Sequence, residues 1–442
     1  MRSRIPKVLH PLAGTPMIDL LLDSCGAAGI DDVIAVISPL HEQVAAHLEG
    51  RCGVVLQARQ LGTGHAVAQV PADRMHGHDV LVLNGDLPLV RPQTIARLRD
   101  AHRASGAPAT LATVEDVSRR DARVLRGPDG ELERIVEYRD ATEDVRALGE
   151  INVGLYCFNG ERLLGALERL RPENQAGELY LTDVFLHLRP TNVLRIDDRN
   201  EAIGVNDRLE LARAERALRE RVLEELMRAG VTVIDPATTF VDAGVQVGCD
   251  TVLEPGTLLR GRTVIGEGCR IGPFTEIIDS RVGDGAVVTH SWLDGAELGA
   301  NSDCGPYAKL RPGTRVAESV HIGSFAELVR SSVGRGSKVP HVSYLGDATV
   351  GEDVNIGAGT ITANYDGNRK NPTVIEDGAF IGVDTMLRAP LRVGRGATTG
   401  AGAVVTRDVP AGTIAVGMPA RVLRRTSPSS GKEEGLDEGK PG

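Results

Sequence analysis

Asp86 stands where a carboxylate could support metal-dependent chemistry. It ends the run DVLVLNGD (79–86), whose apolar residues are typical of a strand covered on both faces. Open α/β sheets bind ligands at the carboxyl ends of their strands. A carboxylate there is a natural Mg²⁺ ligand beside a nucleoside triphosphate. The alternative is that Asp86 only caps a helix.

The segment VLQARQLGTGHA (55–66) offers groups that could hold a base or a phosphate. Its Gly-Thr-Gly turn allows backbone amides to approach a ligand closely. The side chains of Gln57 and Gln60 can both donate and accept, as recognition of a nucleobase edge requires. A Gly-Thr-Gly sequence is often only a turn, so this segment does not identify a site by itself.

A second polar region, residues 338–370, contains His341 and Tyr344 and then the run NYDGNRK. Acyl transfer from a thioester to an amine needs a base for the incoming ammonium and a group that stabilises the oxyanion. An imidazole titrates near neutral pH, so His341 is the best candidate for the base. The alternative is a structural histidine in a turn.

The elements that position these groups differ between the two halves of the chain. Residues 1–205 alternate apolar runs, such as 31–38 and 79–86, with amphipathic segments such as 91–106, which ends at a glycine. This rhythm predicts a doubly wound, Rossmann-like α/β domain. The charged segment 206–230 predicts a linker helix between domains.

From about residue 231 the aliphatic residues recur every six positions. This period predicts a β-helix of hexapeptide repeats over residues 231–425, whereas a Gly-rich β-sandwich, the alternative, lacks a fixed spacing of six. The tail, residues 426–442, is expected to be disordered. The repeating residues are Val247, Leu253, Leu259, Ile265, Ile271 and Ile277, and then Ile375, Ile381, Leu387 and Val393.

Composition excludes several classes of function. The 442 residues contain 50 Lys and Arg against 60 Asp and Glu, a net charge of −10, which argues against a nucleic-acid binder. No apolar run is long enough to predict a membrane-spanning helix, and no signal peptide is visible. The six cysteines form no CxxC pair, so they predict buried thiols in a reducing cytoplasm.

Seven motifs occur in an order that closely resembles the family of bifunctional bacterial N-acetylglucosamine-1-phosphate uridylyltransferases / glucosamine-1-phosphate acetyltransferases. The resemblance covers nearly the whole chain, and the hexapeptide half makes it specific. It implies a left-handed β-helix, a homotrimer and synthesis of UDP-N-acetylglucosamine for cell-wall precursors. The motifs are PKVLH (6–10), QARQLGTGHA (57–66), NGDLPL (84–89), IVEYRDA (135–141), EINVG (150–154), NQAGELYLTDV (174–184) and GVNDR (204–208).

In the first half, the resemblance implies uridylyl transfer from UTP to N-acetylglucosamine-1-phosphate, with release of pyrophosphate. Such a reaction depends on positioning and charge neutralisation, supplied here by Lys7 and by Mg²⁺ on Asp86 and Asn206. Gln57 with the Gly62-Thr63 turn would hold uracil. The implied UTP and UDP-N-acetylglucosamine site comprises Lys7, Gln57, Gly62, Thr63, Asp86, Ala122, Glu137, Asn152 and Asn206.

In the second half, the resemblance implies acetyl transfer from acetyl-CoA to glucosamine-1-phosphate, with His341 as the general base. The implied acetyl sites form between neighbouring subunits. Glucosamine-1-phosphate would be bound by Arg311, Val329, Tyr344 and Asn355. Acetyl-CoA would be bound by Ala358, Asn364, Tyr365, Lys370, Val383, Ala401 and Met418.

The chain departs from the family pattern at several positions. The family carries a strand and the loop LAAGxGTRM before PKVLH, and the Met of that loop is Met1 here. We expect an incorrectly chosen start methionine, the alternative being a shortened protein that is only an acetyltransferase. Ala122 replaces a usual glycine, Val329 a lysine, Val383 a serine and Met418 an arginine. Arg330 is a candidate to supply the charge missing at Val329, and Arg421, Arg424 or Arg425 to replace the arginine missing at Met418.

A third hypothesis is a nucleotidylyltransferase whose β-helix serves only oligomerisation or regulation. The set His341, Tyr344 and Asn355, together with the NYDGNRK loop, argues against it. Unchanged acetyl transfer in a His341→Ala variant would revive it.

Overall fold

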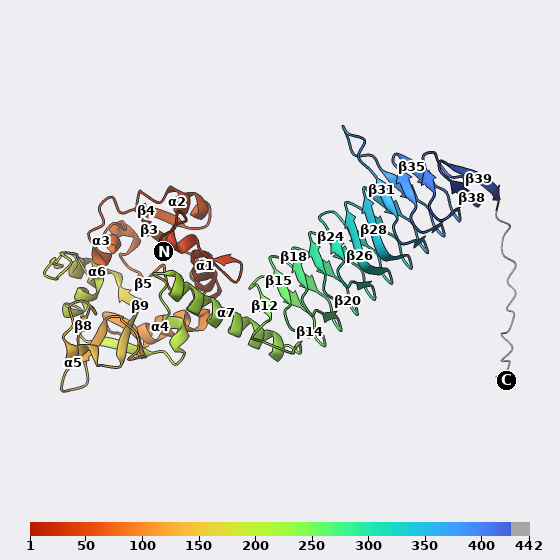
Figure 1. Cartoon of the computed structure of the whole chain (residues 1–442). Helices are drawn as coiled ribbons and strands as arrows, with labels where there is room; N and C mark the ends of the chain where they lie inside the picture. Colours follow the sequence, from red (N-terminus) through yellow and green to blue (C-terminus); the bar gives the residue numbers. More distant parts are fainter. Residues whose placement is uncertain (426–442) are drawn as a thin grey trace, which may run out of the picture. The chain divides into compact units, whose positions relative to one another are not determined.

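The computed structural model describes residues 1–425, and it divides into two compact units between Leu218 and Arg219 (Figure 1). The division falls within helix α7 (Arg208–Arg228), so this helix contributes to both units. The predicted boundaries at residues 205, 230 and 425 stay predictions, and the predicted disordered tail 426–442 lies outside the described residues. Within residues 1–425, no helix is both long and apolar enough to cross a membrane.

The first unit is built around a six-stranded mixed sheet. Its order is β10-β6-β9-β7-β8, with β5 also paired to β9. β10 runs parallel to β6, and the other pairings are antiparallel. The strands are β5 (Asp79–Leu83), β6 (Ala109–Glu115), β7 (Arg123–Arg126), β8 (Leu132–Val136), β9 (Glu150–Asn159) and β10 (Thr191–Arg195).

Helices pack against this sheet through aliphatic residues. Helix α4 lies over 92–105, because Pro92 suits the first helical turn and Gly106, at φ 63°, ends it, as the sequence predicts. Leu98 of α4 is fully buried in one core cluster, and Phe158 of β9 in another. The other helices of this unit are α1 (Met17–Ala27), α2 (Glu42–Leu48), α3 (Thr63–Val67), α5 (Glu143–Arg146) and α6 (Gly160–Leu167), with short 3₁₀ turns at Lys7–Leu9 and Leu181–Leu186.

Strand β3 (Ile34–Ile37) is less buried than its apolar sequence predicts. It pairs in parallel only with β4 (Gly53–Leu56), in a two-stranded sheet separate from the six-stranded one. All four residues of β3, and four of the five in β5, are half-buried. Within the described part of the chain, β3 and β5 are each hydrogen-bonded to a neighbouring strand along one edge only. The other edge leaves backbone groups and apolar side chains partly exposed.

The second unit is a β-helix of short parallel strands that stack as rungs from β11 (Thr232–Val233) to β37 (Val404–Val405) (Figure 1). Phe240 lies opposite Leu258, and Leu258 opposite Glu276, so one coil takes 18 residues, or three hexads. The hairpin β38 (Thr413–Gly417) and β39 (Ala420–Arg425) follows.

The six-residue period places the predicted residues in the interior. Leu253, Ile271 and Ile381 are fully buried, and the other repeating aliphatic residues belong to the same core or, in the case of Val247, pack against its edge. Buried Ser and Thr hydroxyls bond to carbonyls of adjacent coils, as Thr257 does to Ile271. The sequence therefore predicted both the repeat and its register.

The prediction that all cysteines are buried is wrong for two of them, because Cys249 is exposed and Cys52 half-buried. The other four are buried, and the thiols are not paired in disulfides. Burial raises the pKa of Cys25 to about 11 and those of Cys157 and Cys304 to about 12. These three thiols are therefore unreactive near neutral pH.

Candidate functional site

Lys7, Asp86 and Asn206 meet in the first unit although they are far apart in the sequence. Lys7 Nζ lies 2.7 Å from Asp86 Oδ2 and donates to Asn206 Oδ1 over 3.0 Å. The backbone fixes this arrangement, because the amide of Val205 donates to the carbonyl of Asp86 over 3.0 Å and so holds Asn206 beside it. The structure thus brings the three residues together.

The oxygens of Asp86 and Asn206 fit a divalent cation. Both lie within 3.0 Å of one positively charged nitrogen, so they converge on a single point. A carboxylate and an amide oxygen are ligands that Mg²⁺ accepts, with water and phosphate oxygens completing its shell. Within the described residues no group of three or more His, Cys, Asp or Glu side chains forms a metal cluster.

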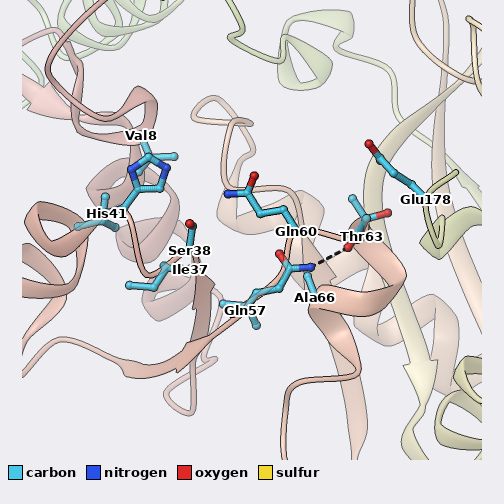
Figure 2. Close-up of a pocket in the computed structure, with 12 residues that line it drawn as sticks. Val8, Ile37, Ser38, His41, Gln57, Gln60, Thr63, Ala66 and Glu178 are labelled. Atoms are coloured by element: carbon cyan, nitrogen blue, oxygen red, sulfur yellow. Dashed lines mark hydrogen bonds between the residues drawn. The ribbon is translucent and has the colours of Figure 1, made fainter. Parts of the chain in front are cut away.

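Gln57, Gly62 and Thr63 line a pocket of about 470 Å³. Figure 2 shows Gln57 and Gln60 between Ser38 and His41 on one side and Thr63 on the other. Nε2 of Gln57 donates to the carbonyl of Gly62 over 3.0 Å, which fixes the amide against the turn. The predicted base-binding residues therefore share one concave surface.

Gly62 must be a glycine because the chain passes very close to it. Its φ is 108°, and a Cβ there would lie 2.5 Å from the carbonyl oxygen of Leu179. The amide of Gly64 donates to that same carbonyl over 2.8 Å, and Thr63 Oγ1 accepts from the amide of Leu181 over 3.0 Å. The segment 179–182 thus holds the turn.

Glu137, Asn152 and Ala122 form a third group. Burial raises the pKa of Glu137, and the hydroxyl of Thr182, which donates to its Oε1 over 3.3 Å, opposes the rise. The side chain of Ala122 is buried, and its carbonyl accepts from the amide of Asn152 over 2.9 Å. Nδ2 of Asn152 donates to the hydroxyl of Tyr156 over 2.7 Å.

Hydrogen bonds link the three groups of the first unit. Residues 179–182 touch both the Gly62-Thr63 turn and Glu137. The amide of Asn84, two residues before Asp86, donates to the carbonyl of Gly154, two residues after Asn152, over 3.1 Å. All nine predicted residues therefore belong to connected parts of one unit.

In the second unit, His341 belongs to a ladder of corner residues along the β-helix, where it lies opposite Ser324 of the preceding coil. His341 is exposed on β28 (Lys338–Gly346). Backbone hydrogen bonds connect this corner from coil to coil. The amide of Gly359 donates to the carbonyl of Val342 over 2.8 Å, and the amide of Asp384 to that of Ala358 over 2.6 Å. The amide of Gly402 donates to the carbonyl of Val383 over 2.8 Å, which brings Ala401 into the same series. Three predicted acetyl-CoA residues thus follow His341 coil by coil.

The predicted sugar-phosphate residues lie on neighbouring strands. Tyr344 is opposite Glu327 of β26 (His321–Val329), and Glu327 Oε1 accepts from Arg311 Nη1 over 3.0 Å. Asn355 of β30 (Asn355–Ile356) is opposite Lys338. Val329 is buried and lies opposite Gly346, so its side chain presents no surface to a ligand.

Residues 364–371 leave the β-helix as a closed loop. Asn371 N donates to Asn364 O over 2.7 Å, and Tyr365 bridges to Lys370 in antiparallel register. The backbone amide of Arg369, followed by other donors of the loop, lowers the pKa of Asp366 to about 2. The loop is therefore organised by its own hydrogen bonds.

Two of the predicted acetyl-CoA residues expose apolar side chains. The side chains of Val383 and Met418 are 48% and 78% exposed. Arg421, a candidate to replace the missing arginine, lies opposite Val416 in the hairpin that carries Met418. The guanidinium of Arg330, next to Val329, pairs with Asp347 through two hydrogen bonds of 2.7 and 3.0 Å.

Sequence reasoning did not single out several residues that hold the predicted ones. The sequence could have indicated Thr182 and Glu178, because both belong to the motif NQAGELYLTDV. Tyr156 and Asp347 carry no such signal, since their contacts with Asn152 and Asn364 depend on pairing between distant strands or coils.

Comparisons with known proteins find a matching family model in each half of the chain. Residues 1–184 match the model of the MobA-like NTP transferase domain, and residues 244–279 match the bacterial transferase hexapeptide model of six repeats. A solved Arabidopsis UDP-N-acetylglucosamine acyltransferase covers 44% of this chain and 73% of its own, at 15% identity and a TM-score of 0.33, which is too low to carry an argument.

Curated relatives match nearly the whole chain. The bifunctional protein GlmU of Heliobacterium modesticaldum is 48% identical over 422 residues, which cover 94% of this chain and 92% of that protein. The bifunctional protein GlmU of Thermotoga maritima is 44% identical over 426 residues, which cover 96% and 95% of the two chains. Similarity of this extent spans both units.

Proposed function

Because this chain belongs to the GlmU family of bifunctional proteins, we propose that it makes UDP-N-acetylglucosamine by acetylating glucosamine-1-phosphate and then transferring uridylyl from UTP. The observation that carries the proposal is the 48% identity over 94% of the chain. The clustering of the predicted residues within each unit supports it. We further propose that the enzyme works in the cytoplasm.

In the first unit, a phosphate oxygen of N-acetylglucosamine-1-phosphate attacks the α-phosphorus of UTP, and pyrophosphate leaves. Gln57 and the Gly62-Thr63 turn line the pocket that would take uracil. Glu137 and Asn152, with the backbone of Ala122, would bind the sugar. Lys7 would neutralise charge on the triphosphate. Mg²⁺ bound by Asp86 and Asn206 would add to this neutralisation.

In the second unit, the amine of glucosamine-1-phosphate attacks the thioester carbonyl of acetyl-CoA. His341 takes the proton of the amine, and coenzyme A leaves as the thiol. Arg311, Tyr344 and Asn355 would bind the sugar phosphate, since a guanidinium binds phosphate in two-pronged fashion. Val329 would contribute through its backbone only, because its side chain is buried.

The remaining predicted residues would hold acetyl-CoA. The corner ladder of Ala358, Val383 and Ala401 continues from the base His341, which suits a long acyl donor lying along successive coils. Asn364, Tyr365 and Lys370 would enclose the donor from the loop, and Met418 would contact it from the hairpin through apolar surface.

We propose that the protein assembles as a homotrimer through an exposed column of rings beside His341. Phe274, His290, Tyr307 and Phe325 stack on successive coils, with centroids 5.7, 5.6 and 5.3 Å apart. Phe274, Tyr307 and Phe325 are 57–70% exposed. A contiguous apolar surface of this kind favours cover by another protein surface. The column ends at Val342, so a second copy on it would border His341.

The proposal is tested by assaying both reactions on the 442-residue chain. We expect acetyl transfer from acetyl-CoA and Mg²⁺-dependent release of pyrophosphate from UTP and N-acetylglucosamine-1-phosphate. Loss of acetyl transfer in His341→Ala, with uridylyl transfer retained, assigns the base. A folded chain that performs neither reaction would overturn the proposal.

A second candidate function is acetyl transfer alone. The half-buried residues and unpaired edges of β3 and β5 favour it, because β3 contributes Val36 and Ile37 to the predicted nucleotide pocket and Asp86 follows β5. Acetyl transfer without pyrophosphate release would establish this alternative. Comparable rates for both reactions would exclude it.

A further inference from the structure

Asp347 connects three successive coils of the β-helix at one corner. It follows β28 directly, and its two carboxylate oxygens accept from Nε and Nη2 of Arg330 over 2.7 and 3.0 Å. Oδ2 also accepts from Nδ2 of Asn364 over 2.6 Å. A two-pronged guanidinium–carboxylate pair fixes the position of both groups more firmly than a single contact does.

The carboxylate also determines which way the amide of Asn364 faces. An ionised carboxylate only accepts hydrogen bonds, so it must meet the NH₂ end of the amide. The carbonyl oxygen of that amide is then turned away from Asp347. Asn364 is buried, and its backbone carbonyl closes the loop by accepting from Asn371 over 2.7 Å. Asp347 thus orients the first residue of the loop.

Because residue 346 is a glycine, the side chains of Asn364 and Tyr344 can both pack beside it. A Cβ on Gly346 would lie 2.5 Å from Nδ2 of Asn364 and 2.7 Å from the hydroxyl oxygen of Tyr344, so both side chains occupy the space that a larger residue would fill. The amide of Gly346 donates to Thr362 over 2.7 Å. The side chains of Tyr344 and Asn364 therefore converge over one glycine.

The charges around Asp347 agree with this geometry. The Arg330 guanidinium, followed by the Asn364 amide and the charges of Arg330 and Lys370, lowers the pKa of Asp347. The carboxylate therefore stays ionised across the working range of an enzyme, and it keeps accepting from Asn364.

We propose that Asp347, held by Arg330, is a positioning residue that orients Asn364 for binding of the acyl-CoA substrate. The inference rests on the proposed acetyl transfer, and it assigns to Asp347 and Arg330 a role at that site. Asp347 acts through Asn364 and takes no part in moving the proton. Loss of Asp347 therefore mainly lowers the affinity for acetyl-CoA.

The test measures KM and kcat for acetyl-CoA in Asp347→Asn, which keeps the shape and removes the charge. We expect KM for acetyl-CoA to rise about fivefold to tenfold, with kcat within about twofold of wild type. Uridylyl transfer should be unchanged. The matched control is Asp377→Asn, because Asp377 forms a similar inter-coil pair with Arg395, at 2.8 Å, away from the loop. This control should leave KM unchanged.

A double-mutant cycle separates positioning from simple loss of structure. Asn364→Ala should raise KM about as much as Asp347→Asn, and the double variant should be no worse than either single one. Arg330→Lys, which keeps the charge, should show a smaller rise. Additive effects in the double variant, or an unchanged KM in Asp347→Asn, would overturn the inference. Absence of acetyl transfer in the wild-type chain would instead overturn the proposed function.

Discussion

Nζ of Lys7 lies 2.7 Å from Oδ2 of Asp86, and the same nitrogen donates to Oδ1 of Asn206 over 3.0 Å. The ammonium thus occupies the point on which the two proposed Mg²⁺ ligands converge. A metal bound to both oxygens at that point would displace the ammonium, which could then turn toward the phosphates. One residue would thereby compete with the metal before the substrate binds and assist it afterwards.

Replacing Lys7 with alanine should therefore have opposite effects on metal binding and on turnover. We expect Lys7→Ala to bind Mn²⁺, used as a spectroscopic substitute for Mg²⁺, more tightly without nucleotide. We also expect it to transfer uridylyl about 100-fold more slowly, because a charge that stabilises the transition state is lost. Electron paramagnetic resonance titration and pyrophosphate release measure the two effects.

Acetyl transfer serves as the folding control for Lys7→Ala, and Lys7→Arg tests whether charge alone suffices. Weaker Mn²⁺ binding in Lys7→Ala would show that the ammonium does not stand in the metal position. Unchanged turnover would remove Lys7 from the chemistry.

Glu137 should make sugar binding depend on pH, since burial raises its pKa. As the pH falls through this raised pKa, the carboxylate is protonated and accepts hydrogen bonds from the sugar less well. KM for N-acetylglucosamine-1-phosphate should then rise at the acidic end. In Glu137→Gln this dependence should vanish. The ratio of KM in Glu137→Gln to KM in the wild type should therefore be largest at high pH, where the wild-type carboxylate is ionised. Steady-state kinetics at several pH values measures this ratio. Titration of the substrate phosphate affects both enzymes equally, so it does not change the ratio.

The same shift predicts how stability depends on pH. The folded state binds the proton of Glu137 more tightly than the unfolded state does. Stability is therefore lost as the pH rises from the ordinary pKa of a glutamate to the raised one. Glu137→Gln should melt higher than wild type at neutral pH, and this difference should shrink in acid. A constant difference at all pH values would contradict the assignment.

Local patterns determined what could be predicted from the sequence. The period of six predicted that Ile271 and Ile381 point inward, because each hexad repeats one strand and one turn. Gly106 predicted the end of α4 for an equally local reason. The family resemblance carried by the motifs NGDLPL and GVNDR, rather than a local pattern, implied that Asp86 and Asn206 belong to one site, and the structure brings them together.

Local patterns could not predict features that depend on neighbours distant in the sequence and that no family motif covers. The exposure of Cys249 follows from its place in a turn, and the half-burial of Ile34 follows from the open edge of β3. Arg123 is almost completely buried, where its guanidinium donates only to backbone carbonyls, among them those of Arg119 and Arg146. An arginine in a sequence favours a surface position, so no local pattern indicated this burial.

The column of stacked rings makes the proposed trimer testable. Tyr307→Glu should dissociate the assembly, because it places an unpaired charge within an apolar interface. Sedimentation velocity measures the change. Acetyl transfer should fall with dissociation, since the column ends beside His341. The matched control is Phe240→Glu, an exposed aromatic residue outside the column that lies against Arg219. A monomeric wild-type chain that transfers acetyl groups would contradict the proposal.

Tyr156 should determine how well the first unit holds its sugar. Its hydroxyl accepts from Nδ2 of Asn152 over 2.7 Å, and this contact fixes the amide of a proposed sugar ligand. Tyr156→Phe leaves that amide nitrogen without its partner, which costs about 1 kcal/mol, or about a fivefold rise in KM for N-acetylglucosamine-1-phosphate. KM for UTP should change little. Tyr180→Phe is the matched control, because the buried hydroxyl of Tyr180 has no hydrogen-bond partner among the described residues. An equal rise in KM for both variants would mean that altered packing, rather than the bond to Asn152, causes the effect.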